Sequence, residues 1–373
     1  MIYKTYMLHI GSRHRKAALS LSALSGEEDR PFGDVREVFP MCSAEIGRPI
    51  HPPFDPEVLP ALEQIRALYP PFSLEGIPDT RAAVAEILSR SQPFDLTMGG
   101  KVRKREMTVP AEGDRPEMRI VVLSPTEPTG PWPGIYHTHG GGMIVGAAED
   151  GLEEFAPLVA EFGAVVVSPD YRLAPENPAP APVEDCYAGL VWTARNTAEL
   201  GIDPEHLMIA GMSAGGGLAA GTALLARDRG FPALTHQILM SPMLDDRFMT
   251  PSSKELDGEG MWDSNDNNVG WTALLGERRG GPDVSAYAAP ARATDLSGLP
   301  RTFVACGSAE TFRDEAIDYA QGLSQAGVSV DLHIWGGGFH GFDLRESEAA
   351  IVKASRATRR EFLVRALCDK PVQ

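Results

Sequence analysis

The tightest constraint on the fold of this chain comes from five residues, Gly211-Met212-Ser213-Ala214-Gly215. They follow a short apolar run, Leu207-Met208-Ile209, and precede an alanine-rich helical pattern from Leu218 to Arg229. The predicted order is therefore strand, sharp turn, helix. Two glycines flank the serine because side chains would collide in so tight a turn, and the hydroxyl is held out above a sheet. Gly-x-Ser-x-Gly in this context is typical of a nucleophile elbow.

Apolar runs and helical patterns alternate along most of the chain. The run Ala164-Val165-Val166-Val167 is typical of a central parallel strand that is buried on both faces. This alternation predicts an α/β fold, with an open, mostly parallel sheet of eight strands and helices on both faces. We expect strands near residues 102–109, 118–124, 133–138, 164–168, 207–211, 236–241, 302–306 and 328–335. We expect helices near residues 56–68, 79–89, 150–161, 182–197, 214–228, 312–326 and 344–366.

Two parts of the sequence break this alternation. Two helical patterns lie within residues 46–98, before any strand, and about sixty residues separate the strand near 236–241 from the next one. A compact domain rarely uses that length for a bare connection. We therefore expect a helical cap, made of residues 46–98 and an insertion at about 246–290, on a main domain that spans residues 99–373.

Residues 1–45 are predicted to be a disordered leader, because they are rich in polar residues and show little amphipathic periodicity. Within them, basic residues stand before a short apolar run, Ala17–Leu24, which is similar to a secretory signal peptide. That run is short and contains serines. We therefore favour a leader, or an extension upstream of a start at Met41.

The net charge of −17 restricts the partners of this protein. Nucleic acid and anionic membranes both require a basic surface, so neither is an expected partner. No apolar run approaches the length of a membrane span. The four cysteines have no CxxC spacing and are interpreted as reduced thiols, which favours a cytoplasmic protein, with secretion as the alternative. No metal and no cofactor are expected.

A serine hydroxyl is a poor nucleophile at neutral pH and needs a base within hydrogen-bond reach. His340 is the candidate base among nine histidines, because it stands in a glycine-rich loop, Gly336–Phe342, directly after the last predicted strand. His333 is the alternative. It alternates with apolar residues along that strand, which predicts a position on the polar face of the sheet.

A carboxylate must orient the imidazole and stabilise its protonated form. Three acidic residues follow the predicted strand at 302–306, namely Glu310, Asp314 and Glu315. Thr311 and Asp314 have the spacing of a helix capping box, which assigns Asp314 a structural role. Glu310 lies in the loop at the end of the strand and is favoured as the acid. The order serine, acid, histidine is the one expected for α/β-hydrolases.

The tetrahedral intermediate of acyl transfer carries an oxyanion, which needs N–H donors. The segment His139-Gly140-Gly141-Gly142 follows a predicted strand, and its three glycines have no side chains to block approach to the backbone. We expect oxyanion donors from Gly140, Gly141 and Gly142, together with the N–H of Ala214. A flexible turn and a phosphate cradle are the alternatives, but the phosphate-binding pattern GxxxxGK[ST] is absent from the sequence.

Taken together, four segments resemble the hormone-sensitive-lipase family of α/β-hydrolase esterases. They are His139–Gly142, Asp170–Glu176, Gly211–Gly216, and Arg313–Glu315 with His340–Phe342. The resemblance covers about residues 52–366. It implies Ser213 as nucleophile, His340 as base, the acid at the position of Glu310, oxyanion donors chiefly from Gly141, Gly142 and Ala214, and a cap built from the N-terminal helices and a later insertion.

The sequence departs from this family at two positions. Met212 stands where family elbows usually carry Asp or Thr, so the resemblance assigns no subgroup and no subgroup's substrates. Glu310 stands where Asp is commoner, which a small adjustment of the loop can accommodate. Arg172 and Glu176, in the segment Asp170–Glu176, are interpreted as ion-pair scaffolding.

The sequence therefore predicts a metal-free serine carboxylesterase that hydrolyses short- to medium-chain esters through an acyl-enzyme. An amidase, lactonase or carbamate hydrolase on the same residues is one alternative, and a non-catalytic ligand-binding receptor of the same fold is another. The expected partner is a small-molecule ester, and a homodimer is compatible with the sequence. Bulky apolar residues are expected to line the substrate pocket, namely Met212, Trp262, Trp271 and Phe342.

Overall fold

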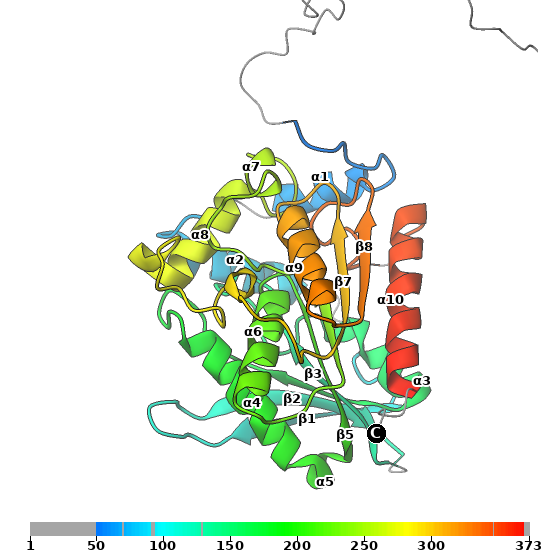
Figure 1. Ribbon diagram of the computed structural model, residues 1–373. Coiled ribbons are helices and arrows are strands. Elements are labelled where there is room, and N and C mark those ends of the chain that lie inside the picture. Colours follow the sequence, from blue (N-terminus) through cyan, green and yellow to red (C-terminus); the bar gives the residue numbers. More distant parts are fainter. Residues whose placement is uncertain (1–49, 69–70, 91–93, 128–129, 346, 369–373) are drawn as a thin grey trace, which may run out of the picture. The chain divides into compact units, whose positions relative to one another are not determined.

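The computed structural model describes residues 50–68, 71–90, 94–127, 130–345 and 347–368. Its strands form one eight-stranded sheet in the order β1-β2-β4-β3-β5-β6-β7-β8 (Figure 1). The pairs β1–β2 and β2–β4 are antiparallel, and the other pairs are parallel. The strands are β1 Val102–Val109, β2 Met118–Pro125, β3 Trp132–Thr138, β4 Val165–Pro169, β5 Ile202–Met212, β6 His236–Met240, β7 Arg301–Gly307 and β8 Val330–Trp335. The predicted sheet is confirmed.

Helices cover both faces of this sheet. Buried side chains of α4 (Ala181–Arg195), α6 (Ala214–Asp228) and α9 (Arg313–Gln325) belong to one apolar cluster. Those of α3 (Ala156–Phe162) and of the C-terminal half of α10 (Ala350–Cys368) belong to a second. Figure 1 shows α9 and α10 on opposite sides of β7 and β8. The remaining described helices are α1 Leu59–Leu68, α2 Ile77–Arg90, α5 Thr197–Leu200, α7 Ser252–Glu255 and α8 Ser264–Leu275, with short 3-10 turns at Leu152–Glu154, Gly276–Arg278 and Pro290–Arg292.

The central strands send alternate side chains into the two clusters. In β2, Ile120 and Val122 join the first cluster, whereas Val121 and Leu123 join the second. Every residue of β4 is buried, as expected for a central strand that helices cover on both sides. The sheet therefore separates two hydrophobic cores. Polar groups can be placed at the ends of its strands, outside both cores.

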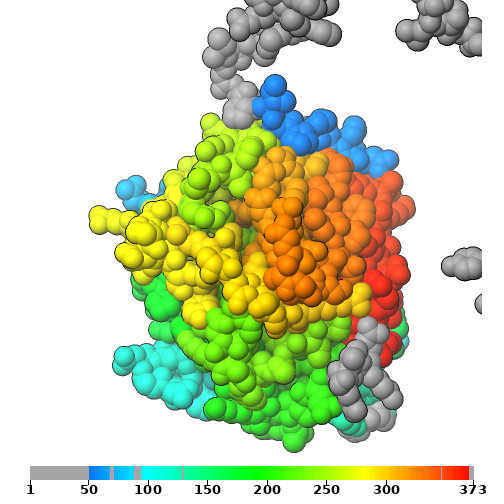
Figure 2. Space-filling view, in the orientation of Figure 1, coloured from blue at the N-terminus to red at the C-terminus, as the bar shows by residue number. Residues whose placement is uncertain are grey.

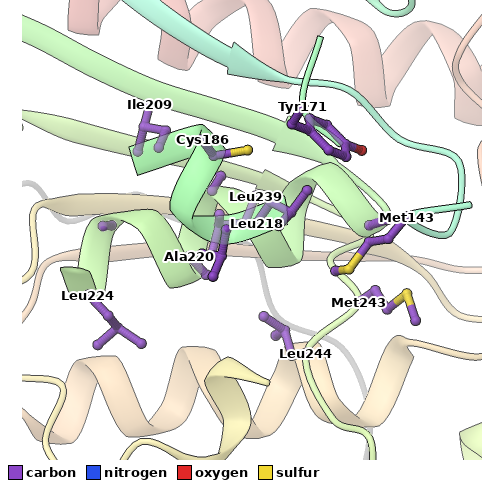
Figure 3. Packing of buried hydrophobic residues seen from close by; sticks show 14 of the residues in the cluster. Met143, Tyr171, Cys186, Ile209, Leu218, Ala220, Leu224, Leu239, Met243 and Leu244 are labelled. Carbon is purple, nitrogen blue, oxygen red and sulfur yellow. The ribbon is translucent and has the colours of Figure 1, made fainter. Parts of the chain in front are cut away.

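Helix α6 is buried along most of its length, from Ala214 to Ala226. Its small residues permit this, because a Cβ at Gly217 would lie only 2.1 Å from the carbonyl oxygen of Met243. Figure 3 shows Leu218 and Ala220 of this helix in the cluster that also contains Leu239 and Cys186. Close packing on several sides holds the helix rigidly, and with it the residue that precedes its first turn.

The two predicted cap segments contact each other. The N–H of Phe72 donates to Asp266 Oδ1 at 3.0 Å, and Asn265 Nδ2 donates to the carbonyl of Phe72 at 3.1 Å. His51 Nε2 lies 3.0 Å from Glu259 Oε2. Figure 2 shows blue atoms from the start of the described chain beside yellow-green atoms of the insertion. The division into cap and main domain stays a prediction.

Several element boundaries differ from those predicted. The helix expected at 150–161 is a 3-10 turn followed by α3, because Pro157 fits only in the first turn of an α-helix. The helix expected at 182–197 ends at Arg195 and is followed by α5, β5 begins at Ile202, and α10 begins only at Ala350. The predicted leader, residues 1–45, lies outside the described residues. Among the helices that the structure describes, none combines the length and the apolar composition that crossing a membrane requires.

Candidate active site

Ser213 occupies the turn between β5 and α6. Its φ of 59° and ψ of −126° place a non-glycine residue in a strained region of backbone conformation. A Cβ at Gly211 would lie 2.2 Å from the carbonyl oxygen of Gly215, and a Cβ at Gly215 would lie 2.1 Å from the carbonyl oxygen of Thr138. Glycine is therefore required on both sides of the serine by close backbone approaches, as the sequence motif indicated.

Three side chains from separate loops meet at this turn. His340 Nε2 lies 2.9 Å from Ser213 Oγ, and His340 Nδ1 lies 3.3 Å from Glu310 Oε1. Ser213, His340 and Glu310 are only 6%, 7% and 1% exposed. With the proton on Nδ1, the imidazole donates to the carboxylate and accepts from the serine hydroxyl. This arrangement allows the imidazole to remove the serine proton.

Glu310 is held by its second carboxylate oxygen. Oε2 accepts from Ser241 Oγ at 2.8 Å and from the N–H of Gly307 at 3.1 Å, which leaves Oε1 for His340. The Phe312 ring meets the imidazole edge to face, with centroids 5.2 Å apart. The contact of Ser241 with Glu310 was not predicted from the sequence. The available signal was its place directly after β6, because the carboxyl ends of parallel strands meet at one edge of the sheet.

The capping box predicted for α9 is wrong. The helix begins after Phe312, which is its N-cap and makes no side-chain cap. Thr311 Oγ1 instead donates to the backbone carbonyl of Trp262 at 2.7 Å. Asp314 Oδ2 accepts from the N–H of Ser252 at 2.8 Å. The insertion packs on this loop and takes up the polar groups that would otherwise cap the helix.

The glycine-rich loop that carries His340 is anchored on both sides. On the N-terminal side of His340, the carbonyl of Gly338 accepts from the N–H of Ala309 at 3.0 Å. After it, Asp343 Oδ2 accepts from Arg359 Nη1 of α10 at 2.6 Å, and the arginine is buried. These anchors restrict a loop whose glycines would otherwise leave the imidazole free to move.

His333, the alternative base, does not lie at this site. Its ring stacks on Trp335 and lies 5.2 Å, centroid to centroid, from the ring of Phe303, which also packs on Phe362 of α10. The predicted polar face is wrong for this strand: Leu332 is exposed and His333 is half-buried, because α10 covers the face that His333 occupies.

The loop of three glycines borders the serine. A Cβ at Gly140 would lie 3.5 Å from the Cβ of Ser213. Gly141 and Gly142 have φ values of 106° and 62°, which favour glycine. Ala214 begins α6 directly after the serine. Within the described part of the chain, the structure gives no acceptor for the N–H groups of Gly141, Gly142 and Ala214, so they are free to donate to a developing oxyanion.

His139, the residue before the three glycines, is held in place by Tyr171 and so supports this loop. Tyr171 Oη donates to the carbonyl of His139 at 2.8 Å, and the two rings stack with centroids 4.1 Å apart. Burial lowers the pKa of His139, so its ring is neutral at neutral pH. The role of Tyr171 was not predicted from the sequence.

Two ion pairs involve the segment Asp170–Glu176, as the sequence suggested. Arg172 Nε lies 2.8 Å from Asp185 Oδ2, and Glu176 Oε1 lies 2.8 Å from Arg81 Nη1. Arg81 Nε also donates to the carbonyl of Ile144 at 2.7 Å. These contacts join α2 and α4 to the segments that flank the glycine loop.

The predicted pocket residues take different places. The indole of Trp262 lies against Gly142, where an added Cβ would be 2.3 Å from Cη2, and its ring centroid is 6.5 Å from that of His340. Met212 reaches the residue after the histidine, since its Cε lies 3.3 Å from the Cβ position of Gly341.

Phe342 and Trp271 do not fit the predicted pocket as well. Phe342 packs against Gly338 and in a small apolar cluster with Val58 and with Leu62 of α1. Trp271 is fully buried in the first core cluster. It is therefore a core residue of α8, and the structure does not place it in the pocket predicted from the sequence.

The described residues contain no group of three or more His, Cys, Asp or Glu side chains that could hold a metal ion. The groups that the structure brings together around Ser213 are a hydroxyl, an imidazole, a carboxylate and backbone N–H groups. These are the components of nucleophilic acyl transfer.

Comparison with known proteins agrees with this geometry. A family model described as alpha/beta hydrolase fold matches residues 135–344. A carboxylesterase from Mycobacterium tuberculosis, NlhH, is 34% identical over 291 residues, which are 74% of this chain and 86% of that protein. An arylesterase from Saccharolobus solfataricus is 32% identical over 295 residues, covering 78% of this chain and 92% of that protein.

Solved structures agree as well. The structure of a bacterial heroin esterase superposes on this one with a TM-score of 0.78 at 38% sequence identity. The match covers 85% of this chain and 98% of the heroin esterase chain. The matched family model spans more than half of the chain, and the relatives cover about three quarters of it. The chain therefore belongs to the α/β-hydrolase fold and, within it, to the hormone-sensitive-lipase family of carboxylic ester hydrolases.

Proposed function

We propose that the protein is a serine carboxylesterase in which Ser213, His340 and Glu310 form the catalytic triad. The observation that carries the proposal is the chain of contacts from Ser213 Oγ to His340 Nε2 at 2.9 Å and from His340 Nδ1 to Glu310 Oε1 at 3.3 Å. The esterase names of the relatives support the same reaction class.

The first half of the reaction acylates the enzyme. His340 removes the hydroxyl proton while Ser213 Oγ attacks the ester carbonyl, and Glu310 stabilises the imidazolium that forms. The oxyanion of the tetrahedral intermediate accepts from the N–H groups of Gly141, Gly142 and Ala214. The protonated imidazole then donates its proton to the leaving alcohol as the carbon–oxygen bond breaks.

The second half repeats these steps with water. His340 removes a proton from water, which attacks the acyl-enzyme carbonyl. The tetrahedral intermediate then collapses to the carboxylic acid as the carbon–Oγ bond breaks, and the imidazolium returns its proton to Ser213 Oγ. The burial of all three side chains excludes bulk water from the charged groups, so each electrostatic contact is stronger than it would be in water.

The substrates are proposed to be water-soluble esters with acyl chains of roughly two to eight carbons, each fitting methylene contributing up to about 0.8 kcal/mol. Trp262 supports an upper limit, because its indole already occupies the space beside Gly142. An amidase, lactonase or carbamate hydrolase would use the same machinery on a less reactive or cyclic carbonyl. A cytoplasmic location and a homodimer stay predictions.

Replacing the nucleophile tests the mechanism. Ser213→Ala is expected to fold normally and to lose turnover of p-nitrophenyl acetate by several orders of magnitude, because the members of a triad act as a unit. Retention of more than a few per cent of wild-type turnover would refute the mechanism. Wild-type protein should also take up one organophosphonate label per chain, whereas Ser213→Ala should take up none. A ligand-binding receptor without catalysis would show neither turnover nor labelling.

A further inference from the structure

Trp262 is placed to limit the room beside the oxyanion loop. The edge of its indole lies against Gly142 and against Gly270 of α8, where added Cβ atoms would be 2.3 and 3.3 Å from the ring. Phe72 of the N-terminal segment packs on the same indole, with centroids 5.4 Å apart. The ring is thus enclosed by both cap segments and by the loop that is proposed to bind the oxyanion.

The segment that carries Trp262 has little regular structure of its own. Residues 256–263 lie between α7 and α8 and form neither helix nor strand. Two of them, Gly258 and Gly260, have φ values of 70° and 81°, which residues other than glycine rarely adopt. A stretch of this kind needs contacts from outside to hold a large ring in one place.

One such contact comes from the residue after the proposed catalytic acid. Thr311 Oγ1 donates to the backbone carbonyl of Trp262 at 2.7 Å, and both residues are buried. The carbonyl of Thr311 in turn accepts from Ser252 Oγ of α7 at 3.0 Å. A buried carbonyl that loses its donor is destabilised, so losing the Thr311 hydroxyl favours rearrangement of the Trp262 segment.

We propose that Thr311 is a positioning residue that fixes Trp262 against the oxyanion loop and thereby sets the acyl-length selectivity of the enzyme. The proposal rests on the proposed esterase function and narrows its substrate class to esters whose group beside Gly142 is small. The residue next to the proposed acid thus links the reacting groups to the boundary of the substrate site, through the hydrogen bond from its side chain to the carbonyl of Trp262.

The test compares kcat/KM for p-nitrophenyl acetate and p-nitrophenyl octanoate in four proteins: wild type, Thr311→Val, Trp262→Ala and the double variant. Valine keeps the shape of threonine and removes only the hydroxyl. Trp262→Ala is expected to raise the octanoate-to-acetate ratio, and Thr311→Val should raise it in the same direction by about fivefold or more. In the Trp262→Ala background, Thr311→Val should change the ratio no further, because coupled residues act non-additively.

Two matched variants separate selectivity from stability. Ser252→Ala removes the hydrogen bond to the Thr311 carbonyl and the one that Ser252 Oγ accepts from the N–H of Asp314. It leaves the bond to Trp262 intact, so it should lower the melting temperature without moving the ratio. Thr311→Ser keeps the hydroxyl and should retain the wild-type ratio. If Thr311→Val does not fold, Thr311→Ala takes its place with the same expectation.

Three results would overturn the proposal. An unchanged ratio in Thr311→Val would reduce the residue to a structural role. Equal loss of kcat/KM for both esters would mean that Thr311 acts on Glu310 instead. If the double variant shifts the ratio by the sum of the two single effects, Thr311 acts on selectivity independently of Trp262. Failure of the esterase mechanism itself would appear differently, as activity that survives Ser213→Ala.

Discussion

At the scale of single residues, the choice among three neighbouring carboxylates depends on where each one forms its hydrogen bonds. Glu310 Oε1 faces His340, whereas Asp314 binds the backbone of Ser252 in α7. Glu315 Oε1 accepts from the N–H of Leu244 at 2.8 Å, and burial raises its pKa well above the usual range. Of these three carboxylates, Glu310 is the one that lies within hydrogen-bond distance of His340.

Exchanging these carboxylates for amides separates their roles. Glu310→Gln is expected to depress kcat strongly, because an amide stabilises the imidazolium far less and can favour the wrong tautomer. Asp314→Asn should keep most of the turnover and lower stability by about 1 kcal/mol through its weakened contacts with Ser252 and Arg313. Steady-state kinetics and thermal melts of both variants decide the matter. If Asp314→Asn is inactive and Glu310→Gln is not, the acid is Asp314 and the assignment of Glu310 is wrong.

A second residue-scale prediction concerns His137 in β3. Burial, and then the neighbouring His139, lower its pKa from 6.5 to about 3. The folded state therefore binds this proton less readily than the unfolded state does. The stability contributed by neutral His137 is complete above about pH 6.5 and is lost as the pH falls towards 3. Between pH 7 and pH 5 this loss is about 2 kcal/mol.

His137→Gln removes the titrating group and keeps a polar side chain near Ser168 Oγ, which lies 3.1 Å from His137 Nδ1. Urea unfolding from pH 7 to pH 5 should give a flatter decline in the free energy of unfolding for this variant than for the wild type. Identical pH slopes would show that His137 is protonated as easily in the folded protein as in the unfolded one.

At the scale of elements, the capping box occurs on α8 and not on α9. Asp263 is the N-cap of α8 and accepts from the N–H of Asp266 at 2.8 Å, while Asp266 Oδ2 accepts from the N–H of Asp263. Asp263 Oδ2 also accepts from the N–H of Gly258 at 2.9 Å. The helix that covers the glycine loop is thus tied at its start to the segment of Trp262.

Asp263→Ala is expected to destabilise the start of α8 by about 1 kcal/mol, because it leaves the first turn of the helix without its acceptor. Hydrogen exchange at the amides of residues 266–268 should accelerate. Asp263→Asn keeps an acceptor oxygen and should protect these amides almost as well as aspartate does. Unchanged exchange in the alanine variant would show that packing alone holds this end of the helix.

At the scale of the whole molecule, the N-terminal region divides into two parts with different expectations. Deleting residues 1–40 should leave turnover and melting temperature nearly unchanged, because their sequence offers little amphipathic pattern for packing. Deleting residues 1–90 should abolish activity. It removes α1 and the residue before it. Val58 and Leu62 pack in one apolar cluster with Phe339 and Phe342, which stand on either side of His340 and Gly341 in the sequence.

Activity assays and melting curves of the two truncated proteins provide the comparison. A large loss after removal of residues 1–40 would mean that this stretch supports the cap. Full activity after removal of residues 1–90 would mean that the α1 cluster is dispensable for holding the histidine loop.

Local sequence patterns were enough to predict the elbow, the parallel sheet and the order of serine, acid and histidine. The elbow follows from sterics within five residues, and the strands follow from apolar runs that only a doubly covered sheet can bury. These features depend on neighbours along the chain. They could be predicted without knowing which distant segments pack together.

Tertiary packing determined the hydrogen-bond partners of Thr311 and Asp314 and the positions of the two tryptophans of the insertion. Thr311 and Asp314 have the spacing of a cap, but the insertion supplies the carbonyl of Trp262 and the N–H of Ser252, and those partners draw both side chains away from α9. Trp262 and Trp271 are equally apolar in sequence, yet one lies against Gly142 and the other is buried in the core. Local propensity cannot distinguish such cases, because the competing partner lies some fifty residues away in the chain and reaches the site only when the insertion folds over the sheet.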